Sequence, residues 1–445
     1  MRLVRLSLFL GAFGIMACDA QPSPAAEQGL LSSTEQVEKI SAALSDFYAH
    51  AHPHPKGLAP DGIVKMGVVE LAEAIKNKRL TSQEATAAFL RRDLAVNPKY
   101  NAIVTYNVHA MDRARDADLD LANGKSWGPL HGVPFTVKDT FATKGVRTTA
   151  GSITLKDYVP EQNAVVVERL LNAGGVLIGK TNTPVLASDV QTVNPLFGRT
   201  NNAVNPDYGA GGSSGGPAVA VALGLSPVDI GSDFGGSIRI PASFNGVYGL
   251  RPTVELVSYR GHVPPLPNEI NGMRHMAVAG PLGRTVDDLG FILPLIAGPG
   301  AGDHRVAPLP PASRTDLSAK DLRIAWTDHF GDLAADPAIG AAMRALAGKL
   351  QSAGAAVVQT EPPNLPYVQA WETFGSLSNH QGDYQTSNVM RRLGEWWTRS
   401  DFADMPVFRR AVAPISVPTY IQDLAVTASS SWRRFSNTTM PGSCR

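Results

Sequence analysis

Apolar residues recur with two different periods along the chain, and their alternation predicts an α/β protein. Residues 66–75 and 164–172 carry apolar side chains at the three-to-four-residue spacing of a helix with one buried face. Residues 133–137 and 176–178 are instead short apolar runs with the length and β-branched content of buried strands. Alternating strands and helices are typical of a sheet covered by helices on both faces. We therefore expect an α/β fold.

Polar residues at the ends of these patterns predict where helices begin and end. Thr81 and Glu84 have the spacing of a capping box, so a helix is expected to begin after Thr81 and to run to about Leu94. Farther along, Asp336 precedes a proline and predicts a second helix start, and Gly354 predicts its end.

The first residues have the pattern of an export signal. Arg2 and Arg5 precede a short apolar run, residues 6–16, that is too short to span a bilayer. Its end resembles a bacterial lipobox, in which Cys18 would become the lipid-bearing first residue. The alternative is ordinary cleavage after Ala20, which gives a plain secreted protein. We expect an exported protein, periplasmic or membrane-anchored as a lipoprotein, whose only membrane contact is the anchor at Cys18.

Three regions follow from these patterns. Residues 1–18 are the expected signal peptide, residues 19–60 a linker with an N-terminal helical part, and residues 61–445 the main domain. The first part of the linker is rich in Pro, Ala and Ser, which is typical of a tether.

Composition excludes several classes of function. The chain has 445 residues, is 44% hydrophobic and carries a net charge of +1 without a basic block, which argues against a nucleic-acid partner. Its two cysteines, Cys18 and Cys444, form neither a zinc motif nor a disulfide framework. Histidines alternate at residues 50–54, where a metal site and a solvated loop are the two alternatives, and the prolines favour the loop. We expect no metal and no cofactor.

A lysine at the end of a strand is the first candidate for chemistry. Lys138 directly follows the apolar run at residues 133–137. If it is buried there, desolvation lowers the pKa of its amine, and a neutral lysine is a usable general base near pH 7. The alternative is a side chain that extends to the surface.

Two glycine-serine segments are the other candidates. Residues 211–216 read Gly-Gly-Ser-Ser-Gly-Gly and lead into an apolar helix, so that helix starts with open N–H groups. Residues 231–242 place two glycines and Ser237 at the end of a strand, a turn that can aim several N–H groups at one point, as an oxyanion hole requires. Ser237 is then the candidate nucleophile, although a plain turn is the alternative for this segment taken alone. The segment around Ser237 differs from the Gly-x-Ser-x-Gly elbow.

Together the three segments resemble the amidase signature family, which includes bacterial amidases and fatty acid amide hydrolase. The resemblance extends over roughly residues 66–297. Further matching stretches lie at residues 148–152, 179–182, 197–198, 249–253 and 280–284. The resemblance implies a large mixed β-sheet and hydrolysis of a carboxylic amide to an acid and ammonia or an amine, with a small or peptidic amide and water as the partners.

The resemblance also implies a role for individual residues. Lys138 falls at the base of the family, Ser213 at the bridging serine beside a cis peptide bond, and Ser237 at the nucleophile that becomes acylated. The oxyanion is expected to bind to N–H groups of Ser237 and of three residues before it, namely Phe234, Gly235 and Gly236. Asp233 and Arg239 flank this segment and are expected to hold the loop.

The C-terminal region departs from the family. Its members continue with a late apolar segment rich in Gly, Pro and Val, and residues 436–445 contain none, so we expect an atypical or truncated end of the domain. Aromatic residues gather at residues 366–420, where they are expected to contribute to a pocket. Two alternative functions follow: a catalytically impaired binding protein, or one component of a tRNA-dependent amidotransferase.

Overall fold

The structure is a computed structural model that describes residues 31–50, 59–265, 276–301, 303, 305–306, 317–330, 333–361, 369 and 373–374. The chain divides into two compact units, residues 1–311 and residues 312–445. The expected signal peptide, the lipobox at Cys18 and the C-terminal residues lie outside the described residues. The described residues contain no helix that is long and apolar enough to cross a membrane.

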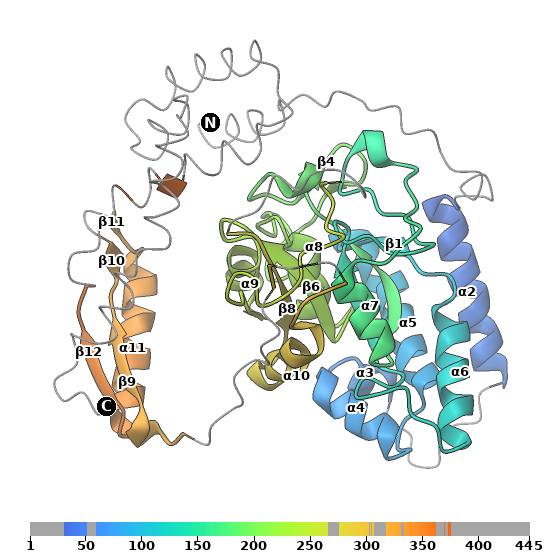
Figure 1. Ribbon diagram of the computed structural model, residues 1–445, viewed down its shortest axis with the longest axis horizontal. Coiled ribbons are helices and arrows are strands. Elements are labelled where there is room, and N and C mark those ends of the chain that lie inside the picture. The colour runs from blue at the N-terminus through green and yellow to red at the C-terminus, as the bar shows by residue number, and fades with distance from the viewer. Residues whose placement is uncertain are drawn as a thin grey trace, which may run out of the picture. The chain divides into compact units, whose positions relative to one another are not determined.

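A six-stranded mixed sheet forms the centre of the first unit (Figure 1). Its strands, in spatial order, are β1 (Ile103–Tyr106), β3 (Val176–Thr181), β2 (Pro134–Lys138), β6 (Val228–Asp233), β8 (Val278–Gly283) and β7 (Tyr248–Gly249). β2 pairs parallel with both β3 and β6, whereas β1, β8 and β7 pair antiparallel with their neighbours. The expected α/β fold with a mixed sheet is therefore confirmed.

Helices cover the sheet because the parallel strands need crossovers. β2 connects to β3 through α7 (Val165–Asn172), and β3 connects to β6 through α8 (Gly215–Ala222). These two crossovers run in opposite directions across the sheet, so right-handed connections place α7 and α8 on opposite faces. The other helices of this unit are α2 (Ser33–His50), α3 (Pro60–Ile63), α4 (Val68–Lys76), α5 (Ser82–Tyr100), α6 (Ala110–Ala122), α9 (Arg239–Asn245) and α10 (Val286–Ile296). Two short strands, β4 (Val193–Asn194) and β5 (Gly198–Arg199), and two 3₁₀ turns, η1 (Ile153–Leu155) and η2 (Val185–Ala187), lie in its loops.

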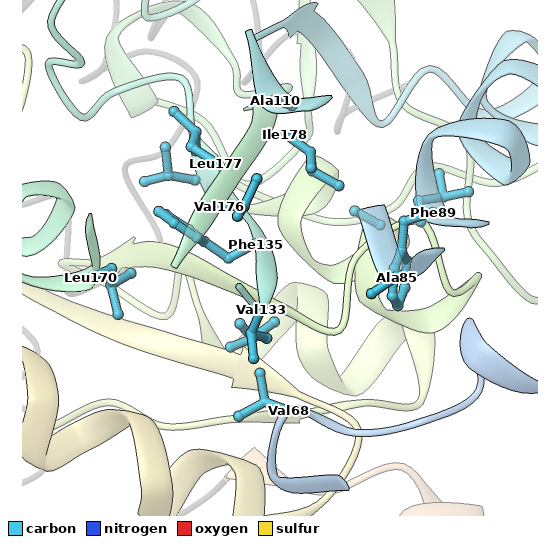
Figure 2. Close-up of a cluster of buried hydrophobic side chains, with 14 of the residues drawn as sticks. Val68, Ala85, Phe89, Ala110, Val133, Phe135, Leu170, Val176, Leu177 and Ile178 are labelled. Carbon is cyan, nitrogen blue, oxygen red and sulfur yellow. The ribbon is translucent and has the colours of Figure 1, made fainter. Parts of the chain in front are cut away.

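The main core lies between the sheet and the helices, as Figure 2 shows. Phe89 of α5, Phe135 of β2 and Leu170 of α7 are at most 1% exposed. Burying one such side chain contributes roughly 1.5–3 kcal/mol to stability. α2 belongs to this core as well, because its Ile40 is fully buried and the side chain of Gln36 accepts a hydrogen bond from the backbone N–H of Tyr106 (2.9 Å).

The predicted start of α5 is confirmed and its predicted end is wrong. Thr81 accepts a hydrogen bond from the N–H of Glu84, whose side chain accepts one from the N–H of Thr81. The helix continues past Leu94 to Tyr100. It does so because the side chain of Asn97 accepts hydrogen bonds from the N–H groups of two residues at the start of the following strand, Ala102 and Ile103, and so fixes the last turn of α5 against β1.

The described residues of the second unit include the helix α11 and several short strands. β9 (Arg323–Trp326) pairs parallel with β12 (Ala356–Gln359), and α11 (Pro337–Ser352) connects them. The expected caps of α11 are confirmed, since Asp336 accepts a hydrogen bond from the N–H of Ala338 (2.8 Å) and Gly354 follows the helix with φ +101°. The strands β10 (His329–Phe330) and β11 (Leu333–Ala334) and the turn η3 (Ala319–Asp321) also belong to the described part of this unit, and residues 369 and 373–374 are helical.

Candidate active site

The carboxyl ends of three parallel strands meet at one edge of the sheet, and the candidate residues lie there. Lys138 is the last residue of β2, and Thr181 and Asp233 are the last residues of its neighbours β3 and β6. Parallel strands carry their carboxyl ends to the same edge, where α/β sheets commonly bind ligands. The order of strands thus places Lys138 between the other two.

Lys138 is fully buried rather than extended to the surface. Its Nζ lies 2.6 Å from Oγ of Ser213 and 2.9 Å from Oγ of Ser232. Burial lowers the pKa of the Lys138 amine to about 7, although the charges of Asp233 and Asp229 oppose this shift. A substantial fraction of the amine is therefore neutral at physiological pH.

Ser213 is presented to Lys138 by the turn that precedes α8. The peptide bond between Gly212 and Ser213 is cis, as the family resemblance implied. A Cβ at Gly212 would lie only 2.8 Å from the carbonyl carbon of Val190, so the turn requires glycine there. Ser213 itself is 1% exposed, which leaves its hydroxyl in a dry environment beside the amine of Lys138.

Ser237 lies in the loop that follows β6, against the start of α8. Its backbone carbonyl accepts a hydrogen bond from the N–H of Ser214 (3.0 Å), the residue after Ser213. Gly235 is exposed and Ser237 is partly exposed, so this loop reaches the surface beside the buried pair Lys138 and Ser213. Lys138, Ser213 and Ser237, the predicted base, bridging serine and nucleophile, therefore lie at one strand end and in two adjoining loops.

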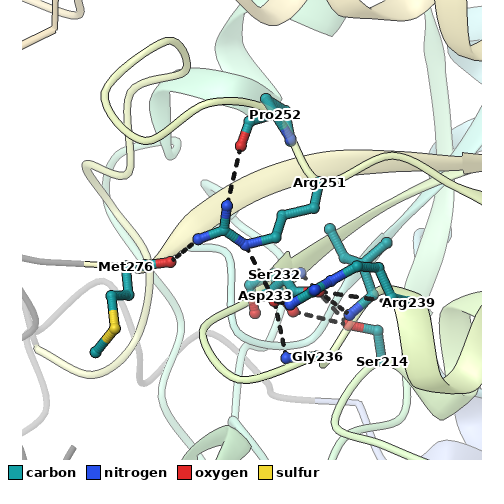
Figure 3. Close-up of polar contacts among 9 residues, drawn as sticks. Ser214, Ser232, Asp233, Gly236, Arg239, Arg251, Pro252 and Met276 are labelled. Carbon is teal, nitrogen blue, oxygen red and sulfur yellow. Dashed lines mark hydrogen bonds and ion pairs between the residues drawn. The ribbon is translucent and has the colours of Figure 1, made fainter. Parts of the chain in front are cut away.

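Asp233 holds this loop in shape, as Figure 3 shows. Its carboxylate accepts hydrogen bonds from the N–H groups of Gly236 (2.9 Å) and Ile238 (3.1 Å), and from both Nε and Nη2 of Arg239 (3.0 Å each). Burial favours the neutral acid, but these hydrogen bonds hold the pKa of Asp233 below its ordinary value. Nε of Arg251 lies 3.5 Å from the same carboxylate. The expectation that Asp233 and Arg239 hold the loop is confirmed.

The residues predicted for the oxyanion hole lie in this same loop. Phe234 is partly exposed, Gly235 is exposed, and Gly236 is buried with φ +116°, a conformation that favours glycine. The N–H of Gly236 donates to Asp233 in this structure. Binding of an oxyanion by these N–H groups stays a prediction. For Gly236 to take part, its N–H must either donate to Asp233 and the oxyanion together or break its hydrogen bond to Asp233.

Two residues at the site were not singled out from the sequence. Ser232, in β6, lies between Lys138 and His262, whose Nε2 is 3.0 Å from Oγ of Ser232. Burial lowers the pKa of His262 to about 3, and the positive charge of Lys138 adds to this shift. Ser232 belongs to the glycine-serine segment at residues 231–242, so the sequence offered a signal for it. The local sequence around His262 does not distinguish it from the other nine histidines of the chain.

A second set of buried charges lies beside the site. Lys180 pairs with Asp139 (Nζ to Oδ1, 3.6 Å) and donates to the carbonyl of Phe141 (2.6 Å), and burial lowers the pKa of its amine to about 8. Asp229 accepts hydrogen bonds from Thr136 (2.5 Å) and from a threonine at the end of β3, and burial raises its pKa to about 7. These hydrogen bonds anchor the strand ends, so we assign this set a structural role.

Among the described residues, no group of three or more His, Cys, Asp or Glu side chains is placed to hold a metal ion. His50 ends α2 and contacts Asp46 of the same helix. His52 and His54 lie outside the described residues. So do Tyr367, Trp371, Trp396 and Trp397 of the aromatic-rich region at residues 366–420, whereas Phe374 of that region is described and partly buried.

Comparison with known proteins shows which family the chain resembles. A family model described as Amidase matches residues 84–413. One component of the glutamyl-tRNA(Gln) amidotransferase from Moorella thermoacetica is 38% identical over 303 residues, which cover 67% of this chain and 61% of that protein. An acylamidase from Rhodococcus erythropolis is 37% identical over 303 residues, which cover 67% of this chain and 62% of that protein. The chain thus matches less than two thirds of the length of each relative.

A solved structure of a fatty acid amide hydrolase has the same fold. It superposes with a TM-score of 0.72, covers 98% of this chain and 74% of the other, and is 23% identical in sequence.

Proposed function

Because this chain belongs to the amidase signature family, we propose that it is an amidase that hydrolyses a small or peptidic amide through Lys138, Ser213 and Ser237. The products are a carboxylic acid and ammonia or an amine. The observation that carries the proposal is the fully buried amine of Lys138, 2.6 Å from Oγ of Ser213 and with its pKa lowered to about 7. Lys180 is also buried but pairs with Asp139, whereas the amine of Lys138 lies within hydrogen-bond distance of two serine hydroxyls.

In the proposed reaction a proton moves along the three side chains. Neutral Lys138 accepts the proton of Ser213, and Ser213 accepts that of Ser237 as its Oγ attacks the amide carbonyl. N–H groups of the loop at residues 234–237 stabilise the negative charge that forms on the carbonyl oxygen. Ser213 returns a proton to the leaving nitrogen, the C–N bond breaks, and an acyl-enzyme forms on Ser237. Water then hydrolyses this ester and restores the free serine.

The pH dependence of the rate tests the role of Lys138. The amine is a base only when it is neutral, so activity is lost as pH falls through its pKa and is complete above it. We expect kcat/KM for a simple aryl amide to rise about tenfold per pH unit below pH 7 and to level off above about pH 8. A rate that does not change between pH 5 and 9, or one that still rises at pH 10, contradicts the assignment of Lys138 as the base.

The 38% identity to a component of an amidotransferase supports a second candidate, in which glutamine is the amide that is hydrolysed. Release of ammonia from glutamine, compared with hydrolysis of a panel of acyl and aryl amides, separates the two candidates. We favour the free amidase, because the export signal expected at residues 1–18 does not suit an enzyme of the translation apparatus. Hydrolysis of glutamine alone, by protein found in the cytosol, would favour the second candidate.

We also propose that the enzyme is exported and anchored through Cys18. The basic residues Arg2 and Arg5 before the apolar residues 6–16 support this proposal. Wild-type protein is expected in the membrane fraction with Cys18 as its first residue, and Cys18→Ala is expected to release it into the soluble fraction, because lipid chains supply the membrane affinity. A soluble wild type that begins at Gln21 contradicts the anchor, and cytosolic protein that retains Met1 contradicts export.

A further inference from the structure

His262 is held beside the end of β2 by backbone contacts. The N–H of Ala142 donates to the carbonyl of Gly261 (2.9 Å), and the N–H of Val263 donates to that of Thr140 (2.6 Å), so residues 261–263 run along residues 140–142. The imidazole is 1% exposed and stacks on the ring of Tyr259, with centroids 4.3 Å apart and planes at 19°. Its position relative to Lys138 is thus fixed by the fold.

The contacts of His262 define which of its nitrogens carries the proton. Nδ1 lies 3.3 Å from the carbonyl of Pro264, which can only accept, so Nδ1 is the donor. In a neutral imidazole Nε2 is then an acceptor, and burial lowers the pKa of His262 to about 3, which keeps the ring neutral. The hydroxyl of Ser232, 3.0 Å from Nε2, must therefore donate its single proton to His262.

This arrangement determines how Ser232 interacts with the base. With its proton committed to His262, Oγ of Ser232 accepts a hydrogen bond from the hydroxyl of Tyr259 and meets Lys138 as an acceptor, at 2.9 Å from Nζ. A neutral amine has two N–H groups and one lone pair. When one N–H points at Ser232, the lone pair is free to face Ser213, 2.6 Å away. If Ser232 instead donated its proton to Nζ, it would occupy the lone pair that the base needs.

We propose that His262 is a positioning residue, which keeps Ser232 as a hydrogen-bond acceptor and thereby directs the lone pair of Lys138 toward Ser213. The proposal rests on the proposed function, since it gives His262 a role in activating that base. In this role His262 acts on Lys138 through Ser232 and not on the substrate.

Two substitutions separate positioning from packing. His262→Phe keeps an aromatic ring against Tyr259 but has no acceptor for Ser232, whereas His262→Gln loses the ring but offers Oε1 as an acceptor near the place of Nε2. We expect His262→Phe to lower kcat about tenfold with little change in KM, because a misdirected base loses part of its contribution. We expect His262→Gln to stay within about threefold of the wild-type kcat. If His262 contributes only packing, His262→Gln is expected to have a lower kcat than His262→Phe, and that result overturns the proposal.

A double-mutant cycle and a control complete the test. In a Ser232→Ala background His262→Phe is expected to have no further effect on kcat, because the two residues act through one contact. A double variant whose loss in kcat is the product of the two single losses contradicts this expectation.

His131→Phe is the control for loss of a buried imidazole. His131 is also buried, with Nε2 3.1 Å from the carbonyl of Ala117, and its replacement is expected to change thermal stability but not kcat. All variants are first labelled with a fluorophosphonate. A wild type that is not labelled at Ser237 refutes the proposed function and this inference with it, whereas a labelled wild type with the reversed order refutes the inference alone.

Discussion

Replacing Ser237 with alanine is expected to lower amide hydrolysis by on the order of 10⁴- to 10⁶-fold, the effect of removing the nucleophile of a serine hydrolase. Without Oγ of Ser237 no acyl-enzyme can form. The fold should be retained, because the contact of Ser237 that supports the loop is made by its backbone carbonyl, which accepts from the N–H of Ser214 (3.0 Å). Steady-state hydrolysis of an aryl amide and the melting temperature of the variant measure the two effects.

Ser214→Ala is the matched control for this variant. The hydroxyl of Ser214 donates to the carbonyl of Ser232 (3.2 Å) and lies beside the site without belonging to the relay. Activity should therefore survive its removal far better than the removal of Ser237. If Ser237→Ala hydrolyses amides at the wild-type rate, Ser237 is not the nucleophile.

Replacing Lys138 is expected to have the next largest effect, a loss of about 10²- to 10⁴-fold in kcat/KM, which is the usual contribution of a general base. Lys138→Met fills most of the same volume without the amine. It should also leave the protein folded, because it removes a buried group whose charged form is destabilised by burial, as its lowered pKa shows. Rates at about pH 8, where the wild-type amine is mostly neutral, measure the loss.

Lys138→Arg distinguishes a base from a cation. Arginine keeps its charge at every pH where the protein is folded, so it cannot accept the proton of Ser213. We expect this variant to be as inactive as Lys138→Met, provided that melting curves show both to be folded. An active arginine variant would mean that Lys138 acts through its charge, and the proton relay would then be wrong.

Local sequence determines part of the surroundings of Lys138, Ser213 and Ser237, the three residues proposed for the proton relay. Lys138 ends an apolar run that becomes the buried strand β2, and its side chain is fully buried there. Ser213 and Ser237 stand among glycines that shape two turns, one with the cis peptide bond and one with a positive φ at Gly236. Local pattern marked these three positions as candidates but left a surface lysine and a plain turn open, and the family resemblance implied their roles.

Other features depend on contacts between distant segments and were not predictable in the same way. His262 comes from a loop that follows the sheet strand β7, and it reaches the site only because residues 261–263 lie along residues 140–142. The hydrogen bond from Gly236 to Asp233 likewise depends on how the loop folds back on itself. The end of α5 was misplaced for the same reason, since Asn97 extends the helix through bonds to the next strand.

Peptide mapping of the wild-type protein after reaction with a fluorophosphonate tests the central claim most directly, because it identifies the atom that attacks. The account predicts a single adduct at Ser237 itself, located within its peptide by fragmentation and formed faster as pH rises toward about 8, when the amine of Lys138 is neutral. An adduct on any other residue, or no adduct from a protein that hydrolyses amides, would contradict the assignment of Ser237 as the acylated residue.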